Sequence, residues 1–285
     1  MTESQWDYLL KNLGRWSGSF TRLSPAGQVQ SDQPSLVTLE ALNNRQTIRQ
    51  AIQKFDAAGK QIYDRTLEYS SLGRSTLFFA DGAFSQGSTQ FGAFAEFGAE
   101  LGLISGDRRL RLVQQFAPNS PTPDNPIPAS QLSQITLIRE HRQGTPVAAR
   151  PALTPEQLVG SWQGEAVTLY PDWRPLAHFT TALTVHLESD RLIQQISTPD
   201  MSFSSSAQID GNILRFEQGR HPMQLLLLPD GASCNTPLRI PCRQAFLLEV
   251  GWLLHPNHRQ RMIRSYDAQG EWISLTLVNE YRQNG

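Results

Sequence analysis

The chain has 285 residues, of which 39% are hydrophobic and 18% are charged, and its formal net charge is −1. This composition is typical of a globular protein and argues against a disordered chain or a basic nucleic-acid-binding protein. The first residues lack the pattern of a signal or transit peptide, and no apolar run approaches the length of a membrane span. We therefore expect a cytoplasmic protein with no membrane span and no nucleic-acid partner.

The first predicted element is a short helix. Ser4 is suited to cap its start, its apolar residues share one face, and Gly14 ends it. The sequence Gly-x-Trp-x-Gly follows directly at residues 14–18 and begins a predicted strand that carries Trp16.

Most of the remaining chain is predicted to form antiparallel strands. Apolar and polar residues alternate in many short segments, and turns rich in Gly, Pro, Asp and Asn separate them. The clearest alternating segments are Gln46–Phe55, Asp64–Tyr69, Arg109–Phe116, Gln134–Arg142, His178–Leu187, Asn212–Glu217, Gln244–Val250 and Arg259–Tyr266. Many short strands without long helices predict an all-β sandwich or barrel, and closure into a barrel removes exposed sheet edges.

The segment of residues 81–106 has an unusual composition, with six glycines, four phenylalanines and no Lys or Arg. One interpretation is an apolar surface or barrel mouth that accepts a ligand or partner, because aromatic side chains supply contact area at low entropy cost. The other is a set of sharply bent strands whose phenylalanines fill the core. The residues in question are Phe84, Phe91, Phe94 and Phe97, together with the neighbouring Glu100.

The next strand carries the main basic feature of the chain. Arg109 and Arg111 alternate with Leu110 and Leu112, so the two arginines share one face of the strand. They indicate either a contact with an anion or an acidic partner, or a solvated outer face with cross-strand ion pairs. The proline-rich residues 117–131 that follow are interpreted as a loop inside the first half of the chain.

Three sequence patterns occur twice, in the same order. The pairs of segments are 14–18 and 160–164, 109–116 and 259–266, and 135–142 and 275–282. Their offsets of 146, 150 and 140 positions are nearly equal, which indicates a tandem repeat. We therefore predict two tandem antiparallel β-barrels, residues 1–143 and 153–285, each preceded by a short helix.

No pattern in the chain indicates enzymatic chemistry. The sequence holds no nucleophile elbow, phosphate loop, dinucleotide fingerprint or metal-ligand spacing. We therefore predict no catalytic residue, no cofactor and no metal site, and favour a protein that is not an enzyme. Cys234 and Cys242 are interpreted as incidental reduced thiols, with a redox pair as the alternative.

A Gly-x-Trp after a short helix, with an arginine near the end of the last strand, resembles the lipocalin or calycin barrel. In that superfamily the tryptophan closes one end of the barrel and the terminal arginine packs on its face, a favourable cation–π contact. The resemblance implies that Trp16 pairs with Arg139 or Arg142, and that Trp162 pairs with Arg282.

A narrower resemblance rests on residues 6–20, 67–74, 81–88 and 108–113. These segments are similar to a cyanobacterial and chloroplast family of formerly unknown function that carries tandem lipocalin-like barrels. The resemblance covers nearly the full length and is strongest in residues 6–142. The family's chloroplast relative is a biogenesis factor for the catalytic head of ATP synthase. The resemblance therefore implies a protein-binding assembly factor whose partners are ATP synthase head subunits.

Two other functions stay open. Lipocalin barrels often carry hydrophobic ligands, so the chain is also considered as a carrier of a fatty acid, a carotenoid or a tetrapyrrole. Cyanobacterial bilin lyases of one type are lipocalin-like as well, although no motif in this sequence favours that activity. An apolar cavity in either domain is the observation that bears most directly on the carrier.

Overall fold

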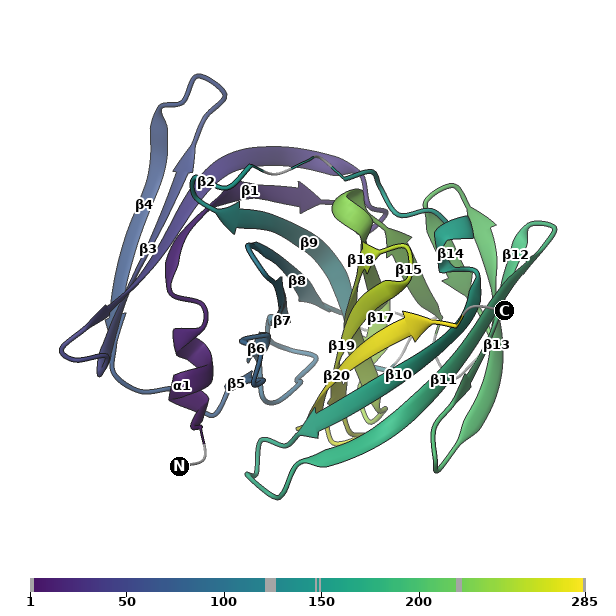
Figure 1. Cartoon of the computed structure of the whole chain (residues 1–285). Helices are drawn as coiled ribbons and strands as arrows, with labels where there is room; N and C mark the ends of the chain where they lie inside the picture. Colours follow the sequence, from purple (N-terminus) through teal and green to yellow (C-terminus); the bar gives the residue numbers. More distant parts are fainter. Residues whose placement is uncertain (1–2, 121–126, 147, 149, 219–221, 284–285) are drawn as a thin grey trace.

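The computed structural model describes residues 3–120, 127–146, 148, 150–218 and 222–283. The proline-rich segment 117–131 and the predicted boundary at 143–152 therefore lie partly outside the described residues. The predicted all-β fold is confirmed, because antiparallel strands make up most of the chain and α1 is a short helix at its start. The strands form two curved sheets that lie side by side (Figure 1).

The N-terminal sheet is a curled half-barrel and not the closed barrel predicted from the sequence, because the strands at its two ends do not pair. Its elements are α1 (Gln5–Leu10), β1 (Gly14–Leu23), β2 (Val29–Leu42), β3 (Thr47–Phe55), β4 (Gln61–Tyr69), β5 (Thr76–Phe78), β6 (Phe84–Gly87), β7 (Phe97–Ser105), β8 (Arg108–Asn119) and β9 (Ala129–Arg142). The strand order is β4-β3-β2-β1-β9-β8-β7-β6-β5, so β4 and β5 are the two edges. Figure 1 shows the β3–β4 hairpin at the outside of the molecule, with α1 between this hairpin and β5–β6.

The C-terminal sheet closes into an antiparallel barrel. Its elements are η1 (Glu156–Leu158), β10 (Gly160–Leu169), β11 (Ala177–Glu188), β12 (Arg191–Ser197), β13 (Ser202–Asp210), β14 (Ile213–Phe216), β15 (Met223–Leu227), η2 (Pro229–Gly231), β16 (Ala232–Pro237), β17 (Arg239–Pro241), β18 (Phe246–His255), β19 (His258–Tyr266) and β20 (Trp272–Arg282). Ten of these strands close the barrel, while β17 leaves it and pairs with β9 of the half-barrel.

The two sheets start in the same way. Ser4 and Asp7 form a capping box at the start of helix α1, and a 3-10 turn, η1, precedes the barrel. After each of them the strand begins at a glycine with positive φ, Gly14 at 123° and Gly160 at 128°, a backbone conformation that other residues rarely adopt.

The second glycine of the half-barrel motif has a different role. A Cβ atom on Gly18 would lie 1.9 Å from the carbonyl oxygen of Arg139 on the neighbouring strand β9. Only a residue without a side chain allows β1 and β9 to approach each other this closely.

An aromatic cluster joins the two sheets. Phe97 of the half-barrel lies 5.6 Å from Phe246 and 5.1 Å from Tyr266, measured between ring centroids. Phe91 also packs against Phe246, and Phe116 against Phe97. These residues belong to one buried cluster that continues into the half-barrel, whereas a second cluster fills the closed barrel. The outer face of β7 and β8 is therefore covered by β18 and β19 rather than by solvent.

Polar contacts support the same interface. The buried Arg264 donates to Ser85 Oγ at 3.0 Å and to the carbonyl of Ser88 at 3.1 Å. Gln114 donates to the carbonyl of Glu249 at 3.2 Å. Within the part of the chain that the structure describes, no helix is long and apolar enough to cross a membrane.

Candidate functional site

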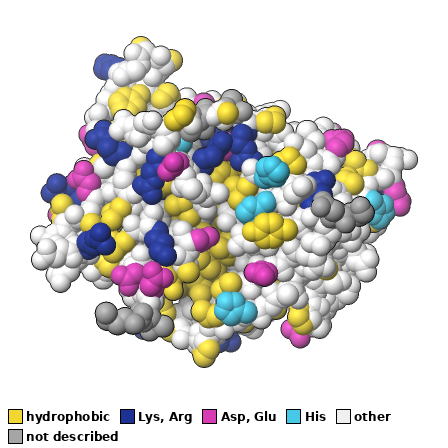
Figure 2. Space-filling view, viewed as in Figure 1, with side chains coloured by type: hydrophobic (Ala, Val, Ile, Leu, Met, Phe, Trp, Pro, Cys, Tyr) yellow, Lys and Arg dark blue, Asp and Glu magenta, His cyan; other side chains and the backbone are white. Residues whose placement is uncertain are grey.

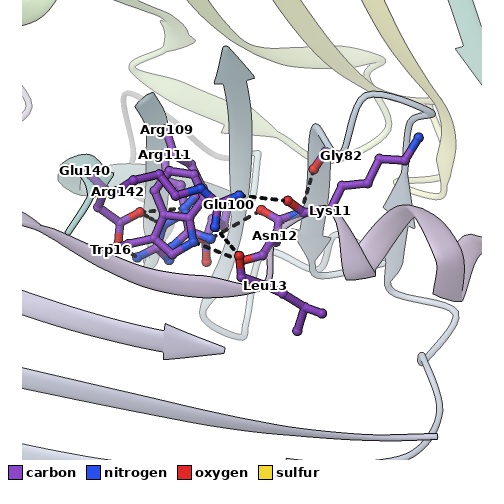
Figure 3. A network of polar contacts seen from close by, with 10 residues as sticks. All are labelled: Lys11, Asn12, Leu13, Trp16, Gly82, Glu100, Arg109, Arg111, Glu140 and Arg142. Carbon is purple, nitrogen blue, oxygen red and sulfur yellow. Dashed lines mark hydrogen bonds and ion pairs between the residues drawn. The ribbon is translucent and has the colours of Figure 1, made fainter. Parts of the chain in front are cut away.

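The indole of Trp16 lies between two arginines at the closed end of the half-barrel. The guanidinium carbons of Arg109 and Arg142 lie 4.4 and 4.2 Å from the ring centroid. The indole nitrogen donates to the carbonyl of Asn12 at 2.9 Å, and Arg142 donates to the carbonyl of Leu13. Two cation–π contacts and a satisfied indole N–H therefore tie β1, β8 and β9 to the segment after α1 (Figure 3).

A ladder of ion pairs continues from this tryptophan. Arg109 Nε lies 2.7 Å from Glu140, and Arg111 Nη2 lies 2.9 Å from the other oxygen of the same carboxylate. Arg111 also pairs with Glu100 at 2.7 Å, and Arg109 donates to Asn12 at 3.2 Å. Strands β7, β8 and β9 supply the four charged residues, which Figure 3 shows converging on one point. Two cations and two anions thus neutralise each other inside the sheet.

Burial and charge act in opposite directions on the carboxylate of Glu140. Burial alone would raise its pKa, but the neighbouring Arg109 and Arg111 outweigh this effect and hold the pKa at about 2. Burial lowers the pKa of Arg109, against the attraction of Glu140. The carboxylate is therefore locked in its charged form at neutral pH and is not available as a general acid.

The closed barrel contains the same arrangement at the equivalent positions. Arg259 and Arg282 lie 4.8 and 4.6 Å from the ring centroid of Trp162. Arg259 pairs with Glu280, and Arg261 joins Glu280 at 2.7 Å to Glu249 at 3.1 Å. Here too the arginines outweigh the effect of burial and hold the pKa of Glu280 at about 2. The repeated sequence patterns therefore place the same side chains around each tryptophan.

The two interiors differ in the space that they leave. The half-barrel holds a cavity of about 340 Å³, and the corresponding cavity in the closed barrel measures about 70 Å³. The larger cavity is lined by apolar side chains such as Val37, Leu39 and Phe84, and also by polar ones, among them Gln50, Gln86, Arg109 and Arg111. Its size is within the lower range of small-molecule sites.

The other predicted site residues lie in two further environments. Arg139 donates to Ser19 and Thr21 on β1. The arginines that pack on Trp16 are Arg109 and Arg142 instead. Phe84 stacks on Phe78, with 5.2 Å between centroids, beside the cavity. The structure therefore does not bring the predicted residues into one surface.

The phenylalanines of segment 81–106 divide in the same way. Phe91 and Phe97 are buried against the closed barrel, whereas Phe94 is 80% exposed. The partner of this glycine- and phenylalanine-rich segment is thus largely the second sheet of the same chain, and Phe94 alone of the four remains available to another molecule.

Glu140 and Glu280 are central to the two ladders, yet neither was among the residues predicted to form a site. Both occur at the same position of a repeated pattern, 140 residues apart, and this signal was present in the sequence. An acidic residue at a fixed place in both patterns, opposite arginines that also recur, was the sign of a buried pair.

The surface carries scattered charge. On the face drawn in Figure 2, Lys and Arg side chains gather over the half-barrel and His side chains lie over the closed barrel. Among the described residues, no group of three or more His, Cys, Asp or Glu side chains is placed to hold a metal ion. Cys234 is buried and Cys242 is partly exposed, and both are free thiols.

Two family models match the chain, one for each half. Residues 2–145 match the N-terminal part of a domain of unknown function, DUF3598. Residues 149–283 match the C-terminal domain of a protein described as biogenesis factor required for ATP synthase 1. No curated protein sequence matches the chain.

Solved structures resemble the chain to different degrees. A DUF3598 family protein of unknown function from Nostoc punctiforme is 46% identical, covers 99% of this chain and 100% of its own, and superposes with a TM-score of 0.90. An S-type phycobiliprotein lyase from Guillardia theta is 13% identical, covers 46% of this chain and 91% of its own, and has a TM-score of 0.37. A transferrin binding protein B from Haemophilus parasuis is 9% identical, covers 95% of this chain and 76% of its own, and has a TM-score of 0.25.

Proposed function

This chain belongs to the DUF3598 family, and we propose that it is a non-enzymatic assembly factor that binds a subunit of the ATP synthase catalytic head. The observation that carries the proposal is the match of residues 149–283 to the C-terminal domain of an ATP synthase biogenesis factor. That match covers the closed barrel and its 3-10 turn. The family membership agrees with the resemblance seen in the sequence.

The chemistry of the interior supports a role without catalysis. Glu140 and Glu280 are each held between two arginines, and their pKa values of about 2 leave them charged and paired at neutral pH. A catalytic acid or base needs a pKa near the working pH and access to a substrate proton. The ladders instead fix strands in place, which suits a rigid scaffold for binding.

The partner can be sought directly. The full chain, tagged and expressed in a photosynthetic host, is expected to recover ATP synthase head subunits in affinity purification followed by mass spectrometry. An unrelated tagged protein of similar size serves as the control. Repeated recovery without enrichment of any head subunit over this control would contradict the proposal.

We place Phe94 in the partner surface. Its side chain is 80% exposed on a loop beside the seam between the sheets, and exposed aromatic residues often dominate binding energy. Phe94→Ser is expected to reduce the recovered head subunit by about tenfold or more, the range of a hot-spot residue. Phe203→Ser is the matched control, because Phe203 is also exposed, at 44%, but lies on β13 of the closed barrel.

One observation favours a second function, that of a carrier. The half-barrel cavity of about 340 Å³ is lined by both apolar and polar side chains, and Arg109 in its lining has an Nη2 atom without a hydrogen-bond partner among the described residues. A ligand with an apolar body and an oxygen acceptor would satisfy this donor. Native mass spectrometry of freshly purified protein tests the carrier, which predicts a retained small molecule at one copy per chain. Protein that remains at its sequence mass, and that binds no added fatty acid or tetrapyrrole, contradicts it.

A further inference from the structure

The half-barrel has one strand fewer than the closed barrel at a defined place. Glu100 pairs with Val113 across β7 and β8, as Glu249 pairs with Ile263 across β18 and β19, so β7 is equivalent to β18. Counting outward from these strands, β6 and β5 match β16 and β15, and from the other side β4 matches β13. The closed barrel has β14 between β13 and β15, and the half-barrel has no strand between β4 and β5 within residues 3–120.

The residues next to this gap have unused pairing capacity on the β4 side. In the closed barrel, the end of β13 pairs with β14 through Gln208, Ile209 and Asp210. The matching end of β4 is Leu67–Tyr69, which pairs with β3 on one side and with no strand on the other. An edge strand of this kind presents a row of free N–H and C=O groups.

The β5 side of the gap is already satisfied. The side-chain amide of Gln5 donates to the carbonyl of Phe78 at 2.8 Å and accepts from its N–H at 2.6 Å. Helix α1 thus imitates a neighbouring strand for β5, since one amide supplies both a donor and an acceptor. Helix α1 also reaches β4, where the Trp6 ring lies edge-on to Tyr69 at 6.3 Å between centroids. The open edge facing the gap is therefore the part of β4 before Tyr69, whose residues 61–68 are exposed.

The gap leads into the half-barrel cavity. Leu67 and Tyr69 line the cavity from β4, and Thr76 and Phe78 line it from β5. A strand beside β4 would turn alternate side chains into this partly apolar space and the others towards solvent. The occupant that fits is an extended segment in which apolar and polar residues alternate.

We propose that the β4 edge of the half-barrel receives an extended segment of a protein partner as an added strand, in the place that β14 fills in the closed barrel. Main-chain hydrogen bonds supply affinity in this mode of recognition, and alternate side chains supply specificity. The inference rests on the proposed function, because the partner is an ATP synthase head subunit. It adds a second contact besides Phe94, and the form of the bound segment.

Hydrogen exchange of the full chain with purified head subunits tests the inference. Binding of a subunit is expected to slow exchange of the outward amides within residues 61–69 by about tenfold or more, because each becomes hydrogen-bonded. The internal control is β13, residues 202–210, whose exchange should not change. Binding without slower exchange in residues 61–69 overturns the added strand and leaves the proposed function standing. The absence of any binding overturns both.

Proline variants separate backbone pairing from other effects. Neighbouring residues in a strand point their N–H groups to opposite sides, so one of Thr66 and Leu67 directs its N–H into the gap. Of the variants Thr66→Pro and Leu67→Pro, the one that removes this N–H is expected to weaken subunit binding by about tenfold. Its circular dichroism should match that of the parent, since edge strands tolerate proline. Unchanged binding in both folded variants overturns the inference. Slower exchange in residues 61–69 that depends on the concentration of the chain alone would assign the edge to self-association instead, and also overturns it.

Discussion

Arg109 Nε donates to Glu140 across 2.7 Å, and both side chains are almost completely buried within the half-barrel. Arg259 and Glu280 have the same relationship in the closed barrel. In both sheets the pair lies beside a tryptophan that is itself covered by arginine. The ion pairs are therefore part of the closed end of each sheet, and their energetics can be tested by removing one partner at a time.

Replacing Glu140 by glutamine leaves Arg109 and Arg111 buried with half of their compensating charge. We expect Glu140→Gln to lower the free energy of unfolding by about 3–5 kcal/mol, the usual cost of breaking a buried pair. Urea titration followed by tryptophan fluorescence measures this. Glu68→Gln is the control, because Glu68 pairs with Arg49 on the surface, and it should cost no more than about 1 kcal/mol. Equal effects of the two variants would contradict the account.

The two ladders predict sensitivity to acid. The pKa values of Glu140 and Glu280 fall from an ordinary value of 4.5 to about 2 in the folded protein. A lowered pKa stabilises the fold fully above the unfolded value, and this contribution is lost as the pH falls from about 4.5 towards 2. Each carboxylate should account for a loss on the order of 3 kcal/mol. Denaturant titrations across this pH range measure the slope, which Glu280→Gln should make shallower.

Gly18 is expected to tolerate no side chain. A Cβ atom there would lie 1.9 Å from the Arg139 carbonyl oxygen, so Gly18→Ala must push β1 and β9 apart. We expect a loss of about 2 kcal/mol or more in the free energy of unfolding, in the upper range for overpacking. Gly92→Ala is the matched control, because a Cβ at Gly92 meets no atom within 4 Å and its φ is not positive. A Gly18→Ala protein as stable as this control would be inconsistent with the close approach.

Phe97 and Phe94 lie three residues apart and should respond in opposite ways. Phe97 is buried between the two sheets, and Phe97→Ala is expected to cost about 3–5 kcal/mol. Phe94 is 80% exposed, and Phe94→Ala should change stability by no more than about 0.5 kcal/mol. Thermal and urea unfolding of the two variants measure the difference. A similar loss in both would mean that Phe94 contributes to the core.

The two thiols should differ in reactivity. Burial, followed by the charge of Glu249, raises the pKa of Cys234, so this thiol stays protonated and inaccessible in the folded protein. Cys242 is partly exposed. A thiol-specific chromogenic reagent at pH 8 should therefore modify one cysteine per folded chain and two after denaturation. Peptide mapping that finds Cys234 labelled first would contradict the burial of that residue.

Much of the architecture could be predicted from the sequence because its signals are local. The cap at Ser4 and the alternation of residues along strands depend on contacts within a few positions. Gly14 and Gly160 mark the same turn in both sheets for the same reason. The repeated patterns extended this information, since equal spacing placed equivalent strands at equivalent positions. The strand β14 was among the predicted alternating segments, as residues 212–217, but local patterns did not show that the first sheet lacks its counterpart.

The candidate site was less accessible from the sequence. Alternation showed that Arg109 and Arg111 share one face of a strand, but not which face would be covered. In the structure both faces of β8 are buried, one by the Arg–Glu ladder and the other by the closed barrel. A pattern with a period of two cannot distinguish an inner face from an outer face when a second sheet covers the outside.

The sequence by itself determined that the chain forms antiparallel strands, where the two tryptophan strands begin and which family it belongs to. It did so because turns, caps and alternation are properties of neighbouring residues. The tertiary structure decided that one sheet closes while the other stays open at β4, and that Phe97 faces the second sheet while Phe94 faces solvent. It also decided that Arg109 and Glu140 meet across β8 and β9. These outcomes depend on which distant surfaces pack together, and that is settled by the burial of the whole molecule rather than by any one segment.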